Sequence, residues 1–302
     1  MKNIVVVGSL NMDLVMAVDR MPKEGETIKG NSTNYFIGGK GSNQAVAATR
    51  LGNKVSMVGA VGNDTFGEKI KKHLHEEGVN VSTIKTDKET FTGLASIFKT
   101  KSDNSIVVIP GANDFCDKRL VDENEELIKN ADILITQFEV PVETVRYALE
   151  MAKKYNVTTI LNPAPAIEVE KDILKNADII TPNETEFEII TGKVYKDSEE
   201  FEKAMIKWQE ENNTRLIVTR GKLGASFVED NKVKTIKSIE VDVVDTTGAG
   251  DTFNGALGHA LANGYDFEYS VKFAGIAASL SVTKFGAQTG MPSLDLVNKY
   301  LK

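Results

Sequence analysis

The chain has 302 residues, which corresponds to two domains at roughly 150 residues each, although one α/β domain often reaches this length. Hydrophobic residues make up 41% of it and charged residues 26%, a balance that excludes disordered, collagen-like and coiled-coil proteins. Its 36 Lys and Arg against 43 Asp and Glu give a net charge of -7, so no general positive field attracts nucleic acid or an anionic membrane.

The cysteine content and the N-terminus both indicate a cytoplasmic protein. Cys116 is the single cysteine, so no disulfide can form within the chain. The first residues, MKNIVVVGSLNMD, contain an apolar run of only four residues, Ile4 to Val7, which is too short for the core of a signal peptide. No stretch approaches the ~18 apolar residues of a membrane span. We therefore expect a cytoplasmic location and no membrane partner.

Short apolar runs predict the strands of a parallel sheet. The run from Ile4 to Val7 is closed by Gly8, a pattern typical of a strand that is buried on both faces. Helical patterns separate most of the later runs, and this alternation favours βαβ units. The later runs lie at 55–61, 132–136, 158–161, 178–181 and 216–219. We therefore predict an α/β fold with a central, mostly parallel sheet and helices on both of its faces.

Two stretches, 14–37 and 91–109, interrupt this rhythm. Both are strand-like, contain clusters of turn residues and lack a helical pattern. Because isolated hairpins are marginally stable, we expect the two to join in one small sheet. That sheet would be a lid over the α/β domain or a contact with a second subunit. We expect residues 1–302 to form a single α/β domain. The alternative is that both hairpins extend the edge of the main sheet.

The segment VVDTTGAGDTFNGA, at 243–256, carries the strongest indication of a binding site. The end of a strand passes into small residues and then into a helix that begins near Gly250. Free N–H groups and the helix dipole at such a start bind an anion such as phosphate. Asp251 lies in this positive end, where it can accept a proton from a hydroxyl held beside the phosphate. The alternative is an ordinary first-turn charge after a tight glycine turn.

Two common nucleotide-binding motifs are absent from the sequence. No glycine pair is followed by Lys in the frame of a P-loop. The dinucleotide pattern would need three spaced glycines directly after the first strand, whereas Gly8 is followed by Ser9, Leu10 and Asn11. We therefore predict a phosphate site of another type.

A second glycine-rich segment, IGGKGSNQAVAA, lies at 37–48. Its glycines allow backbone to approach a ligand closely, Lys40 supplies a local positive charge, and Asn43 can both donate and accept hydrogen bonds. Such groups suit a polyhydroxylated molecule. The alternative is a flexible turn followed by a helix cap.

Asn11 and Asp13 follow the first strand two residues apart. In an extended chain both side chains point to the same side, so together they can grip vicinal hydroxyls. The alternative is a pair of polar residues on an exposed loop.

Polar residues also follow two later strands. Glu139 comes after the run at 132–136, and Asn183 and Glu186 come after the run at 178–181. In an open α/β sheet ligands bind beyond the carboxyl ends of the strands, so these side chains can face one cleft. Carboxylates beside phosphates require a hard cation, and we therefore expect Mg²⁺. For Asn183 and Glu186 the alternative is an acidic helix N-terminus.

With these motifs in view, the whole chain resembles the phosphofructokinase-B-like sugar kinase family. The resemblance rests on GSLNMD, GGKGSNQAVAA, the strand end with Glu139, NPAPA, TPNETE, TRGKLGA, DTTGAGDTFNGA and KFGAQTGMP, in that order. It implies ATP-dependent transfer of a phosphoryl group to O5 of D-ribose, a phosphotransferase reaction of carbohydrate metabolism. It also implies Mg²⁺ and K⁺ as cofactors, ATP as co-substrate and a homodimer formed through the lid.

The resemblance further implies a role for each motif residue. Asp251 would take the proton from the 5-hydroxyl. The ribose-binding residues would be Asn11, Asp13, Gly39, Lys40, Asn43, Glu139 and Asp251. The anion hole would be formed by Gly248, Ala249 and Gly250. The ATP site would be lined by Asn183, Glu186, Thr219, Gly221, Gly224, Gly250 and Gly275.

For the cations the resemblance implies two sites. Glu186 would hold Mg²⁺ through water. The monovalent cation would be held by the Asp245 carboxylate and by the carbonyls of Thr247, Ser281, Lys284 and Gly286. Two positions depart from the family pattern, since Gly290 stands where Ser is frequent and Gly275 where Asn or His is frequent.

Two other functions remain compatible with the sequence. One is a kinase of another furanose or of a nucleoside, such as fructose or adenosine, although the polar character of Lys40, Asn11 and Asp13 favours a sugar. The other is a non-catalytic sugar-binding protein on the same scaffold, for which loss of Asp251 would be the simplest sign, and Asp251 is present.

Overall fold

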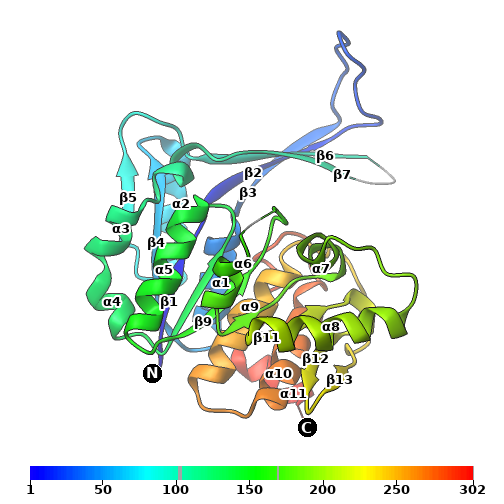
Figure 1. The fold of residues 1–302 in the computed structure, drawn as a ribbon. Coiled ribbons are helices and arrows are strands. Elements are labelled where there is room, and N and C mark those ends of the chain that lie inside the picture. The colour runs from blue at the N-terminus through cyan, green and yellow to red at the C-terminus, as the bar shows by residue number, and fades with distance from the viewer. Residues whose placement is uncertain (101–103, 169, 302) are drawn as a thin grey trace.

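The fold is known from a computed structural model that describes residues 1–100, 104–168 and 170–301. In this described part, nine strands form one large sheet in the order β13-β12-β11-β10-β9-β8-β1-β4-β5 (Figure 1). The strands from β5 to β11 are parallel, and β12 and β13 continue the sheet antiparallel at one edge. The bounds are β1 (Asn3–Val7), β4 (Lys54–Gly62), β5 (Ile84–Asp87), β8 (Ile133–Gln137), β9 (Thr158–Asn162), β10 (Ile179–Ile180), β11 (Arg215–Thr219), β12 (Ala225–Glu229) and β13 (Lys232–Ile236).

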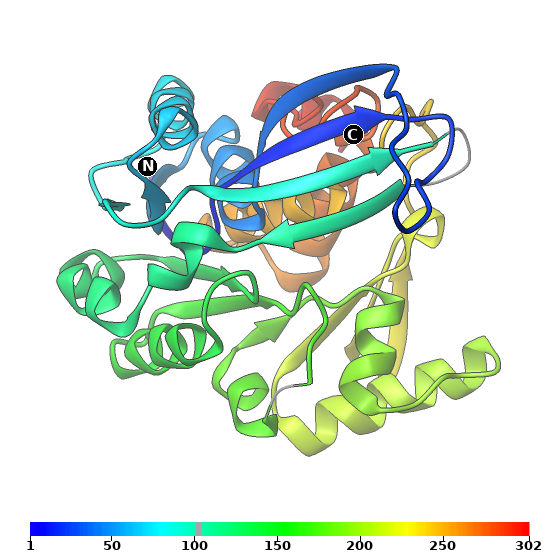
Figure 2. The ribbon, with the colours of Figure 1, turned by 90° about the horizontal axis from the view of Figure 1, so that it is seen from above.

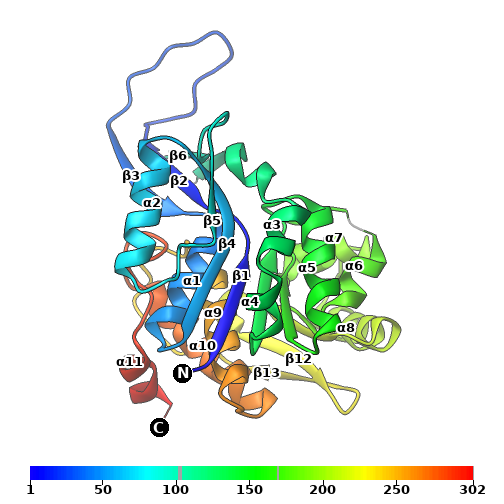
Figure 3. The ribbon, with the colours of Figure 1, turned by 90° about the vertical axis from the view of Figure 1, so that its left-hand side faces the viewer.

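Helices cover both faces of this sheet, as the view along its edge shows (Figure 3). Side chains alternate between the faces: Ile4 and Val6 belong to the core on one side, and Val5 and Val7 to the core on the other. The first layer contains α1 (Lys40–Arg50), α2 (Thr65–Glu76), α9 (Ala249–Ala262), α10 (Phe267–Ser281) and α11 (Leu294–Tyr300). The second contains α3 (Lys118–Glu123), α4 (Glu125–Lys129), α5 (Val142–Lys154), α6 (Lys171–Asn176), α7 (Glu184–Thr191) and α8 (Ser198–Asn212). The predicted α/β fold, with a central and mostly parallel sheet, is confirmed. Among the described residues, no helix combines the length and apolar character that crossing a bilayer requires.

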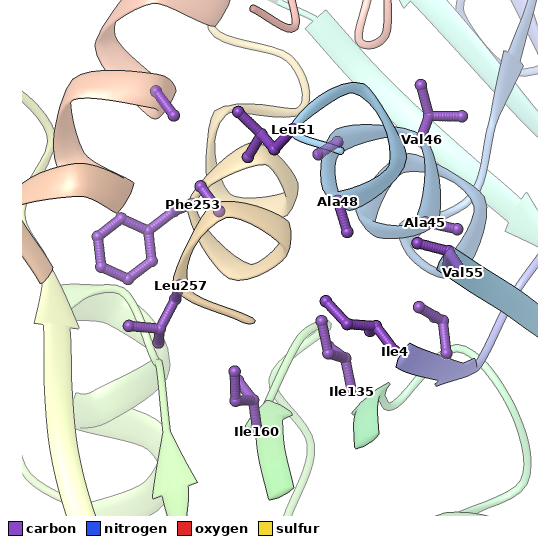
Figure 4. Packing of buried hydrophobic residues seen from close by; sticks show 14 of the residues in the cluster. Ile4, Ala45, Val46, Ala48, Leu51, Val55, Ile135, Ile160, Phe253 and Leu257 are labelled. Atoms are coloured by element: carbon purple, nitrogen blue, oxygen red, sulfur yellow. The ribbon is translucent and has the colours of Figure 1, made fainter. Parts of the chain in front are cut away.

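The first helical layer brings α1 and α9 together over the middle of the sheet. Ile4 of β1 and Ile135 of β8 point up toward these two helices (Figure 4), and a Cβ on Gly258 of α9 would lie 3.6 and 2.9 Å from their Cδ1 atoms. A Cβ on Gly255 of α9 would lie 2.7 Å from the carbonyl oxygen of Gln44 in α1, closer than packed atoms can approach. The glycine therefore allows the two helices that carry the glycine-rich motifs of the sequence to lie in direct contact.

A second, smaller sheet stands beyond the carboxyl ends of the large one (Figures 1 and 2). It has the order β3-β2-β6-β7, with antiparallel pairs β2–β3 and β6–β7 joined by the parallel pair β2–β6. Its strands are β2 (Asn11–Ala17), β3 (Ser32–Gly38), β6 (Gly93–Lys99) and β7 (Asn104–Ile109). The prediction of a small sheet beside the large one is confirmed. Residues 101–103 of the predicted segment 91–109 lie outside the described residues.

Candidate active site

The strand order reverses between β1 and β8, and polar residues follow both strands. In open α/β sheets the crevice at such a reversal is where ligands bind. Ser9, after β1, donates a hydrogen bond from Oγ to Oε2 of Glu139, after β8, at 2.6 Å. The backbone N–H of Lys40 donates to the same oxygen at 3.1 Å. Glu139 therefore fixes the ends of both strands to the start of α1.

The glycines of the 37–48 segment are required by close packing of backbone. Gly39 precedes α1 with φ 88°, a conformation that glycine adopts without strain. A Cβ on Gly39 would lie 2.7 Å from the amide nitrogen of Asn11, and one on Gly41 would lie 2.6 Å from that of Ser9. The alternative of a flexible turn with a side-chain cap does not apply, because the turn is tightly packed and Gly39 is the N-cap without a side-chain hydrogen bond. The turn brings Lys40 and the first turn of α1 to the end of β1.

Asp251, in the first turn of α9, lies buried among amide donors. Nδ2 of Asn43 donates to its Oδ2 at 2.9 Å, and Nε2 of Gln44 donates to its Oδ1 at 3.1 Å. Nε2 of Gln137 donates to Oε1 of Gln44 at 2.6 Å, which orients that amide toward Asp251. Burial raises the pKa of Asp251, against the opposing effects of Lys40 and of the amide donors. Its carboxylate is therefore held in place and has a raised proton affinity, as a general base requires.

Three more ionisable groups share this environment. Burial and the neighbouring Glu139 and Asp251 raise the pKa of Asp13 to about 7. Burial opposes the charge on Lys40, but the carboxylates around it, Asp251 first, raise its pKa overall. Burial also raises the pKa of Glu186, which interacts with both Lys40 and Asp251. One lysine thus faces several carboxylates, a cluster typical of a functional site.

The start of α9 is open for an anion. Gly248 adopts the left-handed conformation, with φ 77°, and its carbonyl accepts the N–H of Thr252 at 2.8 Å. The N–H groups of Gly250 and Asp251 come before this first helical hydrogen bond. They are among the donors that the start of a helix leaves without an acceptor inside the helix. A Cβ added to Gly250 would find no atom within 4 Å. Space and free donors therefore coincide beside the Asp251 carboxylate.

The residues predicted to line an ATP site lie at the ends of β10 and β11 and on α10. Asn183 caps α7 in a reciprocal capping box with Glu186, so the helix-terminus interpretation of this pair applies. The N–H of Thr219 donates to the carbonyl of Pro182 at 2.9 Å, which places Thr219 beside Asn183. A Cβ on Gly224 would overlap the carbonyl oxygen of Ile236, so packing against β13 requires that glycine. The three remaining residues of the set have room for a Cβ: Gly221 in the short helix η2 (Gly221–Leu223), Gly250 in the first turn of α9 and Gly275 in the middle of α10.

Asp245 joins the two segments predicted to hold a monovalent cation. Its Oδ1 accepts hydrogen bonds from the N–H and Oγ1 of Thr247 at 3.0 and 2.7 Å, and its Oδ2 accepts the N–H of Gly286 at 2.9 Å. Burial opposes ionisation, but these donors lower the pKa of Asp245 overall. A Cβ on Gly290 would overlap the carbonyl oxygen of Ser281, at the end of α10. An ionised carboxylate suits a hard cation, and the remaining predicted ligand, Lys284, lies in the same loop as Gly286.

The structure adds polar residues that the sequence motifs did not single out. Asn113, in the short helix η1 (Gly111–Phe115), donates from Nδ2 to Oδ1 of Asn11 at 2.7 Å, so the amide NH₂ of Asn11 is left to face a ligand. Gln44 and Gln288 take part in the hydrogen bonds around Asp251. Gln44 follows Asn43 directly in a glycine-rich motif, which is a signal for it. Asn113 lies in a stretch without any such motif.

The site combines a helix start that is free to bind phosphate with a proton acceptor beside it. It also offers hydrogen-bonding groups suited to several hydroxyls. This combination is typical of a kinase of a small polyhydroxylated molecule. The sequence matches the family described as pfkB family carbohydrate kinase over residues 1–294. The chain therefore belongs to the pfkB family of carbohydrate kinases.

Individual relatives cover the whole chain. A ribokinase from Bacillus subtilis (strain 168) is 42% identical over 301 residues, which are 100% of both chains. A deoxyribokinase from Salmonella typhi is 37% identical, with 99% of this chain and 98% of its own length covered. The structure of an Arabidopsis thaliana ribokinase complexed with ribose and ATP is similar with a TM-score of 0.92 at 33% identity, covering 100% of this chain and 98% of that one.

Proposed function

We propose that this chain transfers the γ-phosphoryl group of ATP to O5 of D-ribose and releases D-ribose 5-phosphate and ADP. The observation that carries the proposal is the buried Asp251 carboxylate, held by two amide donors next to the free N–H groups at the start of α9. The similar ribokinases from Bacillus subtilis and Arabidopsis thaliana support ribose as acceptor and ATP as donor.

The proposed mechanism assigns the sugar to the crevice between β1 and β8. The amide NH₂ of Asn11 donates to a hydroxyl, and the carboxylates of Asp13 and Glu139 accept from others, with Gly39, Lys40 and Asn43 completing the pocket. Charged acceptors make the stronger hydrogen bonds. In this pocket the sugar's 5-hydroxyl faces Asp251 and the start of α9.

Phosphoryl transfer then needs positioning and stabilisation of charge more than covalent chemistry. The 5-hydroxyl oxygen forms a bond to the γ-phosphorus while the bond to the β-γ bridging oxygen breaks and ADP leaves. Oδ2 or Oδ1 of Asp251 takes the hydroxyl proton and later gives it to solvent. The free N–H groups of Gly250 and Asp251 stabilise the charge on the transferred group. The N–H of Ala249, also expected in the anion hole, donates to the carbonyl of Thr246 at 3.3 Å and would have to exchange that bond for the phosphoryl oxygen.

We assign the donor nucleotide to the residues beyond β10 and β11. These are Asn183, Glu186, Thr219, Gly221 and Gly224, and they are joined by Gly250 of α9 and Gly275 of α10. Magnesium, when bound, supplies neutralising charge for the phosphates, and Glu186 is the carboxylate that would hold it through water. A potassium ion would be held by Asp245 and by the carbonyls of Thr247, Ser281, Lys284 and Gly286, beside the start of α9.

We further propose that the small sheet is a lid that closes over the sugar, and that the chain forms a homodimer through it. Phe36 of β3 packs edge to face on Phe285 at 5.5 Å, so the sheet contacts the loop that carries Gly286. Ile106 and Val107, on opposite faces of the edge strand β7, are both exposed, and such an edge pairs readily with another chain. Light scattering should give a mass of twice the 33.0 kDa of the chain; a monomer at micromolar concentration would contradict the dimer.

A single cysteine supports a cytoplasmic location.

A panel of acceptors with ATP and Mg²⁺, with and without K⁺, tests the proposed activity. We expect kcat/KM to be highest for D-ribose, lower for 2-deoxyribose and fructose, and negligible for adenosine. A higher value for 2-deoxyribose would favour the activity that the Salmonella typhi relative is named for. Absence of turnover with every sugar, together with measurable sugar binding, would support the non-catalytic alternative.

A further inference from the structure

Three hydrogen bonds connect the surface of α2 with the buried Asp251. Nε2 of His73 lies 2.8 Å from Oε1 of Gln288. Nε2 of Gln288 donates to Oδ1 of Asn43 at 2.9 Å, and Nδ2 of Asn43 donates to Oδ2 of Asp251 at 2.9 Å. Gln288 belongs to the 284–292 segment, so a residue of that segment reaches the proposed base through a single intermediate amide.

The donor and acceptor character of the side chains fixes the direction of these three hydrogen bonds, which form a line from His73 to Asp251. An ionised Asp251 only accepts, so Asn43 must turn its NH₂ toward it and its carbonyl oxygen toward Gln288. Gln288 must then present its NH₂ to Asn43 and its oxygen to His73. Nε2 of His73 therefore carries the proton, and every donor along the line points inward, toward the carboxylate.

Gln288 is itself held by its backbone. Nη1 of Arg50 donates to the carbonyl of Gln288 at 2.5 Å and to that of Met291 at 3.2 Å. The same guanidinium forms a two-point ion pair with Glu77, through Nε at 2.8 Å and Nη2 at 2.6 Å. The Gln288 side chain is 7% exposed, so water has little access to replace its hydrogen bond to Asn43.

We propose that Gln288 is a positioning residue for phosphoryl transfer: it locks the Asn43 amide with its NH₂ toward Asp251 and thereby keeps this carboxylate ionised and oriented. The proposal rests on the role of Asp251 as proton acceptor. Gln288 does not touch the reacting atoms. Its NH₂ also donates to Oγ of Ser42 at 3.3 Å, but its shorter bond, at 2.9 Å, goes to Asn43, the residue that contacts Asp251. The second oxygen of Asp251 is held independently by Gln44.

The other charges near Asp251 set the background for a pH measurement. Lys40 of α1 favours its ionised form, and Glu139 after β8 opposes it. Asp13 of β2 and Glu186 of α7 also interact with Asp251. At the outer end of the line, Glu77 lies 4.0 Å from Nε2 of His73, and Arg50 pairs with Glu77. Substitution of Gln288 leaves all these groups in place.

Gln288→Glu is the decisive variant, because it keeps the size of the side chain but replaces the NH₂ donor with an acceptor. The Asn43 amide must then turn its NH₂ toward the introduced carboxylate and present its oxygen to Asp251. Asp251 loses a donor and gains a nearby negative charge, so its proton affinity rises. We expect the acidic limb of the kcat profile to move up by about one pH unit, so that kcat falls by about tenfold at pH values below the limb and recovers at high pH.

Two companion variants separate this effect from a general loss of packing. Gln288→Met removes the hydrogen bonds without adding charge, and we expect a loss of about threefold in kcat and a smaller displacement of the acidic limb. Gln209→Glu makes the same replacement at a glutamine of α8 that bridges two backbone groups, the carbonyl of Val228 and the N–H of Leu216. It should leave the acidic limb unchanged.

A double-mutant cycle tests whether Gln288 acts through Asp251, even if Gln288→Glu does not fold. In the Asp251→Asn background, Gln288→Met should cause no further loss of kcat, because its effect passes through the Asp251 carboxylate. A further loss by the same factor as in the wild type would overturn the proposal, as would a folded Gln288→Glu with wild-type kcat and acidic limb. Near-normal kcat of Asp251→Asn alone would instead refute the proposed base and remove the basis of the inference.

Discussion

Asp13 provides a sharp test of how the sugar is bound, because its pKa of about 7 makes its charge change between pH 6 and pH 8. The shift is upward from 3.8 and arises from burial, Glu139 and Asp251, against the opposing effect of Lys40. Asp13 is therefore mostly protonated at pH 6 and mostly ionised at pH 8. An ionised carboxylate accepts from two sugar hydroxyls, whereas the protonated form loses charge and one acceptor site.

If ribose binds only the ionised form, its apparent Kd is divided by the ionised fraction. With a pKa of about 7 that fraction is about 0.1 at pH 6 and about 0.9 at pH 8, so Kd should rise about tenfold as the pH falls between these values. Calorimetry of ribose binding without ATP, in buffers of different ionisation enthalpy, should also detect release of about one proton per ribose at pH 6.

Asp13→Asn is the matched control for this measurement. It should bind ribose weakly, with no pH dependence between 6 and 8, because the titrating group is gone. A wild-type Kd that stays constant over this range, or a dependence that persists in Asp13→Asn, would refute the assignment.

Three glycine substitutions separate folding from catalysis. The Cβ of Gly250→Ala would meet no atom within 4 Å, so the free energy of unfolding should stay unchanged or rise by about 1 kcal/mol through helix propensity. The kcat/KM for ATP should fall at least about tenfold, because the methyl group intrudes on the bound anion. Unchanged steady-state kinetics would argue against an anion at this place. Gly41→Ala, whose Cβ would lie 2.6 Å from the nitrogen of Ser9, should lower the free energy of unfolding in urea by roughly 1–3 kcal/mol, and a wild-type midpoint would contradict the packing argument. Gly290→Ser should lower the melting temperature and weaken the response of that temperature to K⁺, because its Cβ would displace the Ser281 carbonyl; a stronger response to K⁺ would show that the serine acts as an added ligand.

The burial pattern explains why most of the sheet was predictable. Runs such as Ile4 to Val7 are apolar on both sides of the strand, and that follows directly from helices packed on both faces. β13, with Lys232 and Lys234, lies at the edge of the sheet and carries polar residues, so no apolar run marked it. β5, with Lys85, failed to stand out for the same reason.

The site was predictable where a motif directly follows a strand or starts a helix. Asn43 and Asp251 fall into this group, because glycines beside them signalled close backbone approach, although only the fold brings the two side chains to 2.9 Å across 208 positions of sequence. Gln288 and Asn113 were not singled out from the sequence. Asn113 lies outside every motif, Gln288 stands in KFGAQTGMP without a sign that its amide faces the site, and their partners lie 245 and 102 positions away. Their partners depend on how α1, η1 and the 284–292 segment meet in space.

The most direct test of Asp251 as the proton acceptor is a single-turnover measurement of ribose 5-phosphate formation by Asp251→Asn, with ribose affinity measured on the same sample. We expect the transfer rate to fall by about 10²-fold or more, the scale of lost general-base catalysis, while the Kd for ribose stays within about threefold of the wild-type value. A transfer rate close to that of the wild type would contradict the role of Asp251 as proton acceptor.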